Sequence, residues 1–347
     1  MKMEHGFDCI RDGQTLVREE VSPVTRRQLG WIIAGPTARK KTTKKFSEFD
    51  AELDETICDR FTNARLTITL KLGFRQVNPA RGAATGTYHD YGDRRETARQ
   101  IVRWDPGAWA LWKSNFQRTA EQFWDRKFWL INNFPVLEFS DGGVMYRHNV
   151  ECRFNLVGAD ASRGSVHHHT IDVVRLDPSE TFFGSHSTLY DNLDITEIQK
   201  GTTSGGTPIM QRAHVHEVGH LLGLGHSAEG TSACPVSGNT NASACYGTSD
   251  HEKTSVMGQG MDLRPEHAYP WRMAIADMLG SGTVRKPSVN RGLARQQNAI
   301  RVAAGLAGNL TGPDVATSDW TSVMRRHFPR TLAEARAGAR IRTRPDR

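Results

Sequence analysis

The densest group of side chains able to do chemistry lies in residues 214–227. This segment reads His-Val-His-Glu-Val-Gly-His-Leu-Leu-Gly-Leu-Gly-His-Ser. His216 and His220 are four residues apart, so on a helix both imidazoles project from one face, about one turn from each other. That spacing suits two ligands of a tetrahedral metal ion such as zinc. The segment therefore predicts a helix that carries two metal ligands.

Gly223 and His226 extend the pattern. Gly223 comes three residues after His220, where the helix must end and the chain must bend. Glycine has no Cβ and takes the positive φ of such a bend readily, which lets His226 return as a third ligand. Three imidazoles leave a fourth position for water, the arrangement of a catalytic rather than a structural zinc site. We expect one catalytic Zn²⁺ at His216, His220 and His226.

Glu217 directly follows the first expected ligand. At that position its carboxylate lies at the edge of the metal-binding face, within reach of a water bound to the ion. A carboxylate so placed can take a proton from this water and thereby activate it. Glu217 is the predicted catalytic residue of a hydrolase.

Residues 216–226 resemble the long zinc-binding motif of the metzincin metallopeptidases. Metzincins also have a tight turn with a methionine beneath the zinc; residues 255–258, Ser-Val-Met-Gly, are similar to it, and the resemblance gives Met257 this role. Ser227 is the residue of the matrixin branch. The interval before Met257 is longer than in matrixins, and Gln259 stands where astacin-like and serralysin-like members have an extra tyrosine ligand.

The resemblance implies an α+β fold with a twisted mixed sheet and long helices in an α/β-type upper subdomain. The motif helix lies beneath it, followed by a small C-terminal subdomain with the Met-turn and a helix at residues 270–279. The implied activity is that of a zinc metalloendopeptidase acting on a protein or peptide substrate. That substrate lies extended along an edge strand, which we place at residues 170–175. Glu217 passes the proton of the attacking water to the leaving amine.

Periodicity predicts the elements that position the motif. Apolar and polar residues alternate in residues 64–72, 149–157 and 170–176, which indicates half-buried strands. Residues 107–130 are predicted to form a helix packed on a sheet, because they carry an apolar stripe at helical spacing. The stripe consists of Trp109, Trp112, Phe116, Ala120 and Phe123. Residues 47–61 have helical spacing too and are predicted to form an amphipathic helix. Sheet and helices together indicate layered α+β architecture.

Three regions are expected along the 347 residues. Residues 1–63 form an N-terminal extension, a basic linker and one helix, that serves as a leader or pro-segment; residues 64–280 form the catalytic domain. Residues 281–347 form a basic tail with thirteen Lys and Arg against four acidic residues. The net charge of this tail is +9, whereas that of the whole chain is +7, so the remaining residues are slightly acidic. Residues 320–332 of the tail have the spacing of a short helix.

The basic tail supports an alternative function. A metzincin scaffold could use it to bind nucleic acid, another polyanion or a docking partner. Glu217 and the open fourth coordination position favour the enzyme.

No apolar stretch reaches the ~20 residues of a membrane helix, and residues 1–14 lack a Sec-type signal peptide. We therefore expect a cytoplasmic processing enzyme, or a toxin or effector exported by a dedicated secretion system.

The remaining candidates stay open. Of the five cysteines, only Cys234 and Cys245 are close in sequence. They form either a disulfide, worth ~2–3 kcal/mol on a chain-entropy basis, or two free thiols in a reducing compartment. Both lie in residues 228–254, a long insertion after the third ligand that could shape specificity. Residues 167–169 are all histidine and could form a second metal site with His148 or His186, but packing roles are commoner for such residues. His214 is expected to be structural.

Overall fold

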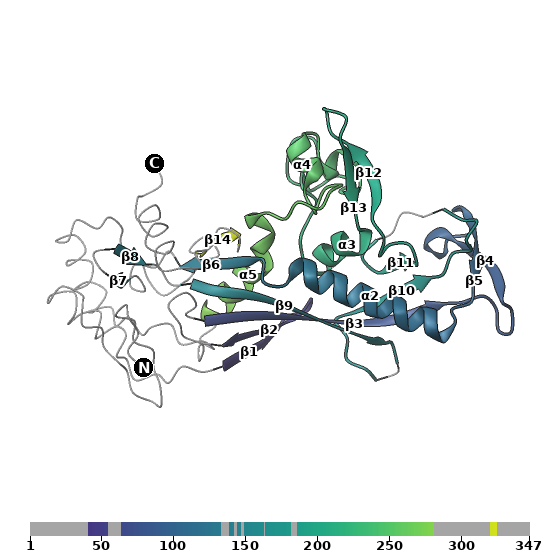
Figure 1. The fold of residues 1–347 in the computed structure, drawn as a ribbon, viewed down its shortest axis with the longest axis horizontal. Helices are drawn as coiled ribbons and strands as arrows, with labels where there is room; N and C mark the ends of the chain where they lie inside the picture. Colours follow the sequence, from purple (N-terminus) through teal and green to yellow (C-terminus); the bar gives the residue numbers. More distant parts are fainter. Residues whose placement is uncertain are drawn as a thin grey trace.

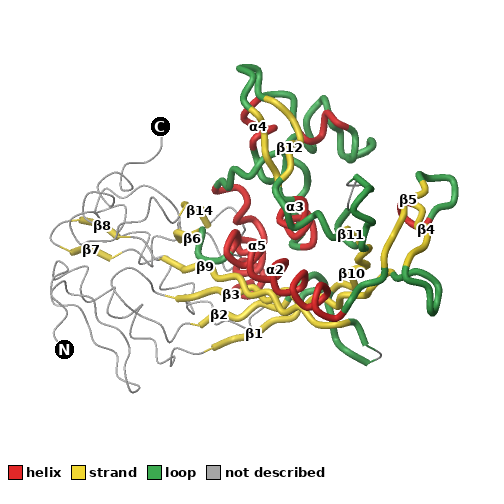
Figure 2. Tube along the Cα trace, turned by 45° about the vertical axis from the view of Figure 1, so that its right-hand side comes forward, coloured by secondary structure: helices red, strands yellow, loops and turns green. Residues whose placement is uncertain are grey.

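The computed structural model describes residues 41–54, 64–132, 139–141, 144–146, 149–162, 164–181, 186–280 and 320–324. The main body is a twisted mixed sheet with three helices along one face (Figures 1 and 2). These helices are α2 (Pro106–Trp124), α3 (Ala213–Leu221) and α5 (Tyr269–Gly280). The predicted α+β class is confirmed at this level, as a mixed sheet with few helices. Among the helices described, none is both long and apolar enough to cross a membrane.

Strand β3 (Ala64–Val77) lies at the centre of the sheet. It pairs antiparallel with β2 (Asp50–Asp54) and parallel with β9 (Asn149–Asp160) and β10 (His169–Val174). The hydrogen-bonded order is β1-β2-β3-β9-β6-β14, with β10 and then β11 added alongside the C-terminal half of β3. The remaining strands of this sheet are β1 (Lys41–Lys45), β6 (Phe128–Asn132), β11 (Leu189–Asp191) and β14 (Trp320–Met324).

In the part of the chain that the structure describes, three two-stranded sheets accompany the main sheet. They are β4 (Thr85–His89) with β5 (Ala98–Val102), β7 (Phe139–Asp141) with β8 (Val144–Tyr146), and β12 (Ile198–Thr202) with β13 (Pro208–Gln211). The β12–β13 sheet is directly connected to the motif helix in sequence, because β13 is followed by α3 after one residue.

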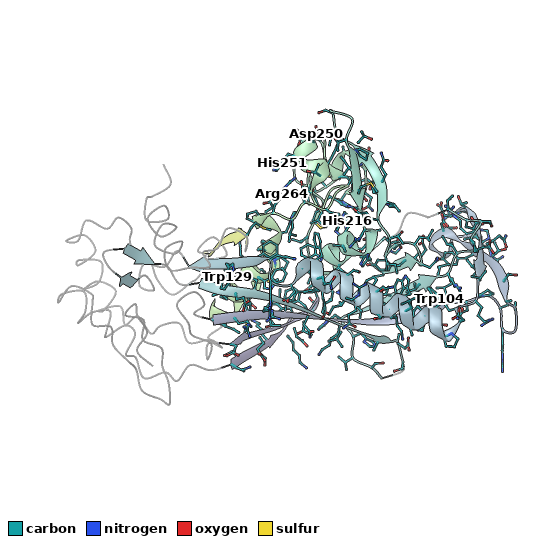
Figure 3. All side chains as sticks on the ribbon, viewed as in Figure 1. Trp104, Trp129, His216, Asp250, His251 and Arg264 are labelled. Carbon is teal, nitrogen blue, oxygen red and sulfur yellow. A yellow bond between two sulfur atoms is a disulfide. The ribbon has the colours of Figure 1, made fainter. Side chains whose placement is uncertain are left out.

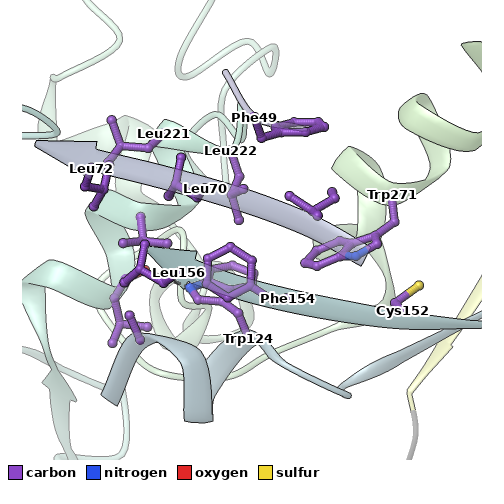
Figure 4. Close-up of a cluster of buried hydrophobic side chains, with 14 of the residues drawn as sticks. Phe49, Leu70, Leu72, Trp124, Cys152, Phe154, Leu156, Leu221, Leu222 and Trp271 are labelled. Atoms are coloured by element: carbon purple, nitrogen blue, oxygen red, sulfur yellow. Dashed lines mark hydrogen bonds between the residues drawn. The ribbon is translucent and has the colours of Figure 1, made fainter. Parts of the chain in front are cut away.

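The predicted strands and the long helix are confirmed. In β3 the leucine and isoleucine side chains at alternate positions are completely buried, while their polar neighbours face the other side. These residues are Leu66, Ile68, Leu70 and Leu72. Figure 4 shows leucines of β3 in one cluster with side chains of β9, α2, α3 and α5. The motif helix is thus packed directly on the central strands.

Helix α2 starts and ends at recognisable residues. The Asp105 side chain accepts a hydrogen bond from Ala108 N at 2.8 Å, and proline occupies the first helical position, where a missing N–H costs nothing. The predicted stripe is buried, except that Trp124 replaces Phe123 in the last turn. The helix ends at Trp124 rather than at residue 130, because residues 128–132 pair with β9 as β6.

The helix predicted for residues 47–61 is wrong. Residues 50–54 form β2, which pairs with β3 and with β1, and residues 55–63 lie outside the described part. Alternating burial of Ala51 and Leu53 in β2 prevails over the helical spacing of the wider window. The basic residues of the predicted linker are a strand where they are described, because Lys41–Lys45 form β1 and pair with β2. Lys41 also forms an ion pair of 2.9 Å with Asp54. The predicted boundary at residue 64 therefore separates two paired strands.

Two further predictions are corrected. Residues 170–175 are not an edge, because β10 has β3 on one side and β11 on the other; Val173 lies opposite both Gln76 and Tyr190. Residues 320–324 of the tail are a strand, β14, antiparallel to β6, and not part of a helix. The rest of the tail lies outside the described residues. Pairing with partners distant in sequence explains both differences.

Candidate metal centre

Helix α3 brings the motif together. It carries His216, Glu217 and His220 and ends at Leu221, with Leu222 as the C-cap. Gly223 follows with a φ of +88°, the left-handed conformation that glycine adopts at helix ends. Its N–H donates to the His220 carbonyl at 2.8 Å. The predicted reason for glycine at this position is confirmed.

The three predicted ligands meet at their Nε2 atoms. His216 Nε2 and His220 Nε2 are 3.0 Å apart, and His220 Nε2 and His226 Nε2 are 3.1 Å apart. Within the part of the chain that is described, this is the one group of three or more histidine, cysteine or acidic side chains whose ligand atoms all lie within 4.8 Å of one another. Figure 3 marks His216 on α3, above the sheet.

Backbone carbonyls fix the tautomer of each imidazole. Every Nδ1 lies 2.7–2.8 Å from a carbonyl oxygen, which can only accept, so Nδ1 carries the proton and Nε2 keeps its lone pair. The carbonyls are those of Val256 for His216, Leu224 for His220 and Thr240 for His226. Three lone pairs that point at one another repel unless a cation lies between them.

The geometry and charge state of the triad suit a divalent metal ion. Ligands at the zinc–nitrogen distance of ~2.0–2.1 Å in a tetrahedron are separated by roughly 3.4 Å, close to the two nitrogen separations of the triad. Burial holds the pKa of His216 well below its usual range and lowers the pKa of His220 to about 4; the charge of His226 acts in the same direction on both. The imidazoles are therefore neutral, as metal ligands must be. The three residues fit a metal ion.

Glu217 directly follows His216 in α3 and lies in a poorly hydrated environment. Only 7% of the surface of Glu217 is exposed to solvent. Burial raises the pKa of its carboxyl to about 8, and the nearby Lys200 ammonium acts in the opposite direction. A cation at the triad would lower that pKa further by attraction. The group can thus hold or release a proton near neutral pH.

Met257 packs against the motif helix α3. It is 1% exposed, and its sulfur occupies the space beside Gly219: a Cβ built there would come within 2.4 Å of Met257 Sδ and 3.3 Å of Trp124 Cζ2. The preceding residue, Val256, supplies the carbonyl that holds His216. The turn that the resemblance singled out therefore contacts the motif helix.

His267 holds this turn and was missed in the sequence. Its Nδ1 accepts a hydrogen bond from Arg264 N at 2.9 Å, so Nε2 carries the proton and donates to Ser255 Oγ at 3.1 Å. Ser255 Oγ in turn accepts from Met257 N at 3.2 Å. Burial lowers the pKa of His267 to about 4. No spacing rule links residue 267 to the motif, so only the fold identifies it.

Neither a family model nor a curated protein nor a solved structure matches this chain. The metzincin resemblance consequently rests on residues 216–226, on residues 255–258 and on the geometry described above.

His214 and Gln211 support the site from the start of α3. His214 Nδ1 donates to the Asp194 carbonyl at 3.0 Å, and its Nε2 accepts from Thr119 Oγ1 at 2.6 Å, which ties α3 to α2. The predicted structural role of His214 is confirmed. Gln211 was not predicted; its Nε2 donates to the Gly258 carbonyl at 2.9 Å and so joins β13 to the Met-turn.

Two elements lie above α3 in Figure 1. One is the β12–β13 hairpin, and the other is the segment with the short helix α4 (Asp250–Thr254). They are joined, because Ser204 N at the hairpin tip donates to Asp250 Oδ1 at 2.8 Å. Figure 3 shows Asp250 with His251 and Arg264 above His216. The inserted segment 228–254 also contains the Cys234–Cys245 disulfide, which settles the open alternative in favour of the bridge.

The second metal site considered for residues 167–169 is not formed by the described residues. His168 is engaged structurally: its Nδ1 accepts from Lys71 N at 2.8 Å, and its Nε2 lies 3.4 Å from Asp50 Oδ1. His148, a suggested partner, lies outside the described part.

A cleft of about 930 Å³ lies away from the triad, against β1, β2, β3, β9 and the C-terminal end of α2. Its charged side chains pair with each other, as in Lys41 with Asp54 at 2.9 Å and Arg153 with Asp125 at 2.8 Å. No triad residue lines it, and its paired charges suggest no chemistry.

Proposed function

We propose that this chain is a zinc-dependent endopeptidase with a metzincin-like catalytic centre. One observation carries the proposal: three neutral imidazoles, each anchored at Nδ1 by a backbone carbonyl, direct three Nε2 lone pairs to one point, and two of them lie on the helix that also carries the buried Glu217. A structural zinc site would use a fourth protein ligand. Among the described residues, no fourth histidine, cysteine or carboxylate joins the group.

His216, His220 and His226 would hold the ion. The chemistry that zinc supplies when bound is polarisation of the scissile carbonyl and a lower pKa for a water molecule, toward ~7. Glu217 would accept the proton of the attacking water and return it to the amine that leaves. Its burial favours this role, because a raised pKa makes the carboxyl an effective proton carrier near neutral pH. No covalent intermediate with the protein is required.

A protein or peptide is the substrate class that the metzincin resemblance implies. Placement of the peptide stays open, since β10 is not an edge strand.

Cleavage of casein together with zinc content per chain tests the proposal. Glu217→Ala should retain one zinc per chain and lose cleavage by at least ~10²-fold, in the range of a general base. Glu96→Ala removes an exposed carboxylate distant from the triad and serves as the matched control. Wild-type cleavage should stop with a chelator and return with zinc. Cleavage by Glu217→Ala at the wild-type rate would overturn the assigned base.

A further inference from the structure

The third ligand is held differently from the other two. His220 bonds to Leu224 in the turn that ends α3, and His216 bonds to Val256 in the buried Met-turn. His226 instead bonds to the carbonyl of Thr240, which lies between Cys234 and Cys245. We propose that the segment closed by the Cys234–Cys245 disulfide is a positioning element of the metal centre, which orients the His226 imidazole and thereby sets metal affinity.

The bridge has to supply the rigidity of this segment. Both cysteines are buried, at 2% and 1% exposure, but all ten residues between them are exposed or half-exposed. No apolar side chain of residues 235–244 is buried in the core, so hydrophobic packing does not hold the Thr240 carbonyl in place. Short-range bonds such as Ala242 N to the Asn239 carbonyl, 3.0 Å, shape the segment locally. Apart from the bond between Thr240 and His226, its attachment to the rest of the protein depends on its two ends.

Both ends are attached close to His226. Ala228 N donates to the Cys245 carbonyl at 2.9 Å, and Gly230 N donates to the Cys234 carbonyl at 2.8 Å. The residue after Cys245 is Tyr246, whose ring centroid lies 4.0 Å from that of His226. A shift of the bridged ends would therefore move both the carbonyl and the ring that fix this imidazole.

The expected effect follows from the role of such hydrogen-bond partners. Loss of the group that orients a metal-binding histidine typically costs ~10–100-fold in metal affinity. Without the bridge, the Thr240 carbonyl stays within hydrogen-bond distance of His226 Nδ1 only part of the time. The three histidine ligands themselves are still present. Affinity should therefore fall, and the stoichiometry of one ion should stay the same.

The double variant Cys234→Ser/Cys245→Ser tests this inference, with zinc affinity measured by competition against a chromophoric chelator. The inference rests on the metal site of the proposed function but not on peptidase activity, so no substrate is needed. Affinity should be ~10–100-fold weaker than in the wild type. With Co²⁺ as the probe, the visible absorption spectrum should change as well, because the orientation of one ligand changes.

A second preparation guards against misfolding of the variant. Wild-type protein is reduced with dithiothreitol and capped with iodoacetamide; unreduced protein exposed to the same reagent is the matched control for the other thiols. The capped protein should show the same weakening. Equal affinity of bridged and unbridged protein would overturn the positioning role and leave the metal site intact. Absence of zinc binding by the bridged protein would overturn the metal site, and the positioning role with it.

Discussion

Gly219, on the side of α3 that faces Met257, offers a sharp test of the packing between the motif helix and the Met-turn. Alanine in place of glycine inside a helix normally stabilises by ~1 kcal/mol. Here the added Cβ would lie 2.4 Å from Met257 Sδ and 3.3 Å from Trp124 Cζ2. Normal contact is ~3.5–4.0 Å, and both neighbours are buried, so they have little room to move. Overpacking costs ~1–3 kcal/mol. Because the overlap with sulfur exceeds ~1 Å, we expect the upper part of that range and a net loss of ~1–2 kcal/mol.

Urea denaturation in the presence of a chelator measures this loss, since bound metal would add its own stabilisation. Gly107→Ala is the matched control. Gly107 lies exposed in the first turn of α2, and the nearest atom to its Cβ would be Asp105 Oδ1 at 3.4 Å. This control should stabilise by up to ~1 kcal/mol. The two glycine substitutions are thus predicted to have opposite signs.

Removal of the obstructing side chain should reverse the effect. In a Met257→Ala background the overlap with Sδ is removed and only Trp124 Cζ2, 3.3 Å from the new Cβ, stays close, so Gly219→Ala should become neutral or stabilising. The change of sign is a coupling that only residues in contact show. If Gly219→Ala stabilises the otherwise wild-type protein as much as Gly107→Ala does, Met257 does not pack against α3 in the way described.

The remaining predictions concern histidines. Burial lowers the pKa of His267 to about 4 from ~6.5 in the unfolded chain. The unfolded chain therefore binds a proton first as pH falls, and the stability that neutral His267 contributes is complete above pH ~6.5 and lost toward pH 4. His267→Gln should flatten the profile of urea midpoint against pH in that window, and an unchanged profile would contradict the burial of a neutral ring. Thr119→Ala should destabilise by ~1–3 kcal/mol in denaturant, because it leaves His214 Nε2 buried without its donor; a loss below ~0.5 kcal/mol would argue against that bond. His220→Ala should abolish stoichiometric zinc binding by equilibrium dialysis, and one retained ion per chain would place the metal elsewhere.

Much of the site was predictable because it is local in sequence. The spacing of His216, His220 and His226 needs only the geometry of one helix and one glycine turn, and both formed as expected. The anchors of the imidazoles were not predictable. They are main-chain carbonyls, which every residue has, so Leu224 and Thr240 give no signal in the sequence.

The fold shows the same division between local and distant information. Period-two burial predicted β3 and β9 correctly, since each strand has one buried face. Strand β2 was mistaken for a helix, because five residues carry too short an alternation to outweigh a longer helical pattern. Strand β14 pairs with β6, whose residues lie nearly two hundred positions earlier in the chain. Such pairing depends on the assembled sheet and has no counterpart in local periodicity.

X-ray absorption spectroscopy at the zinc edge tests the central claim most directly, because it reports the atoms bound to the metal. We predict three imidazole nitrogens and one additional light atom at ~2.0–2.1 Å for wild-type protein loaded with one equivalent of zinc. The spectrum of Glu217→Ala should contain the same three imidazoles. A sulfur ligand at ~2.3 Å, or a shell of four protein ligands, would identify a closed structural site and contradict the catalytic centre proposed for this chain.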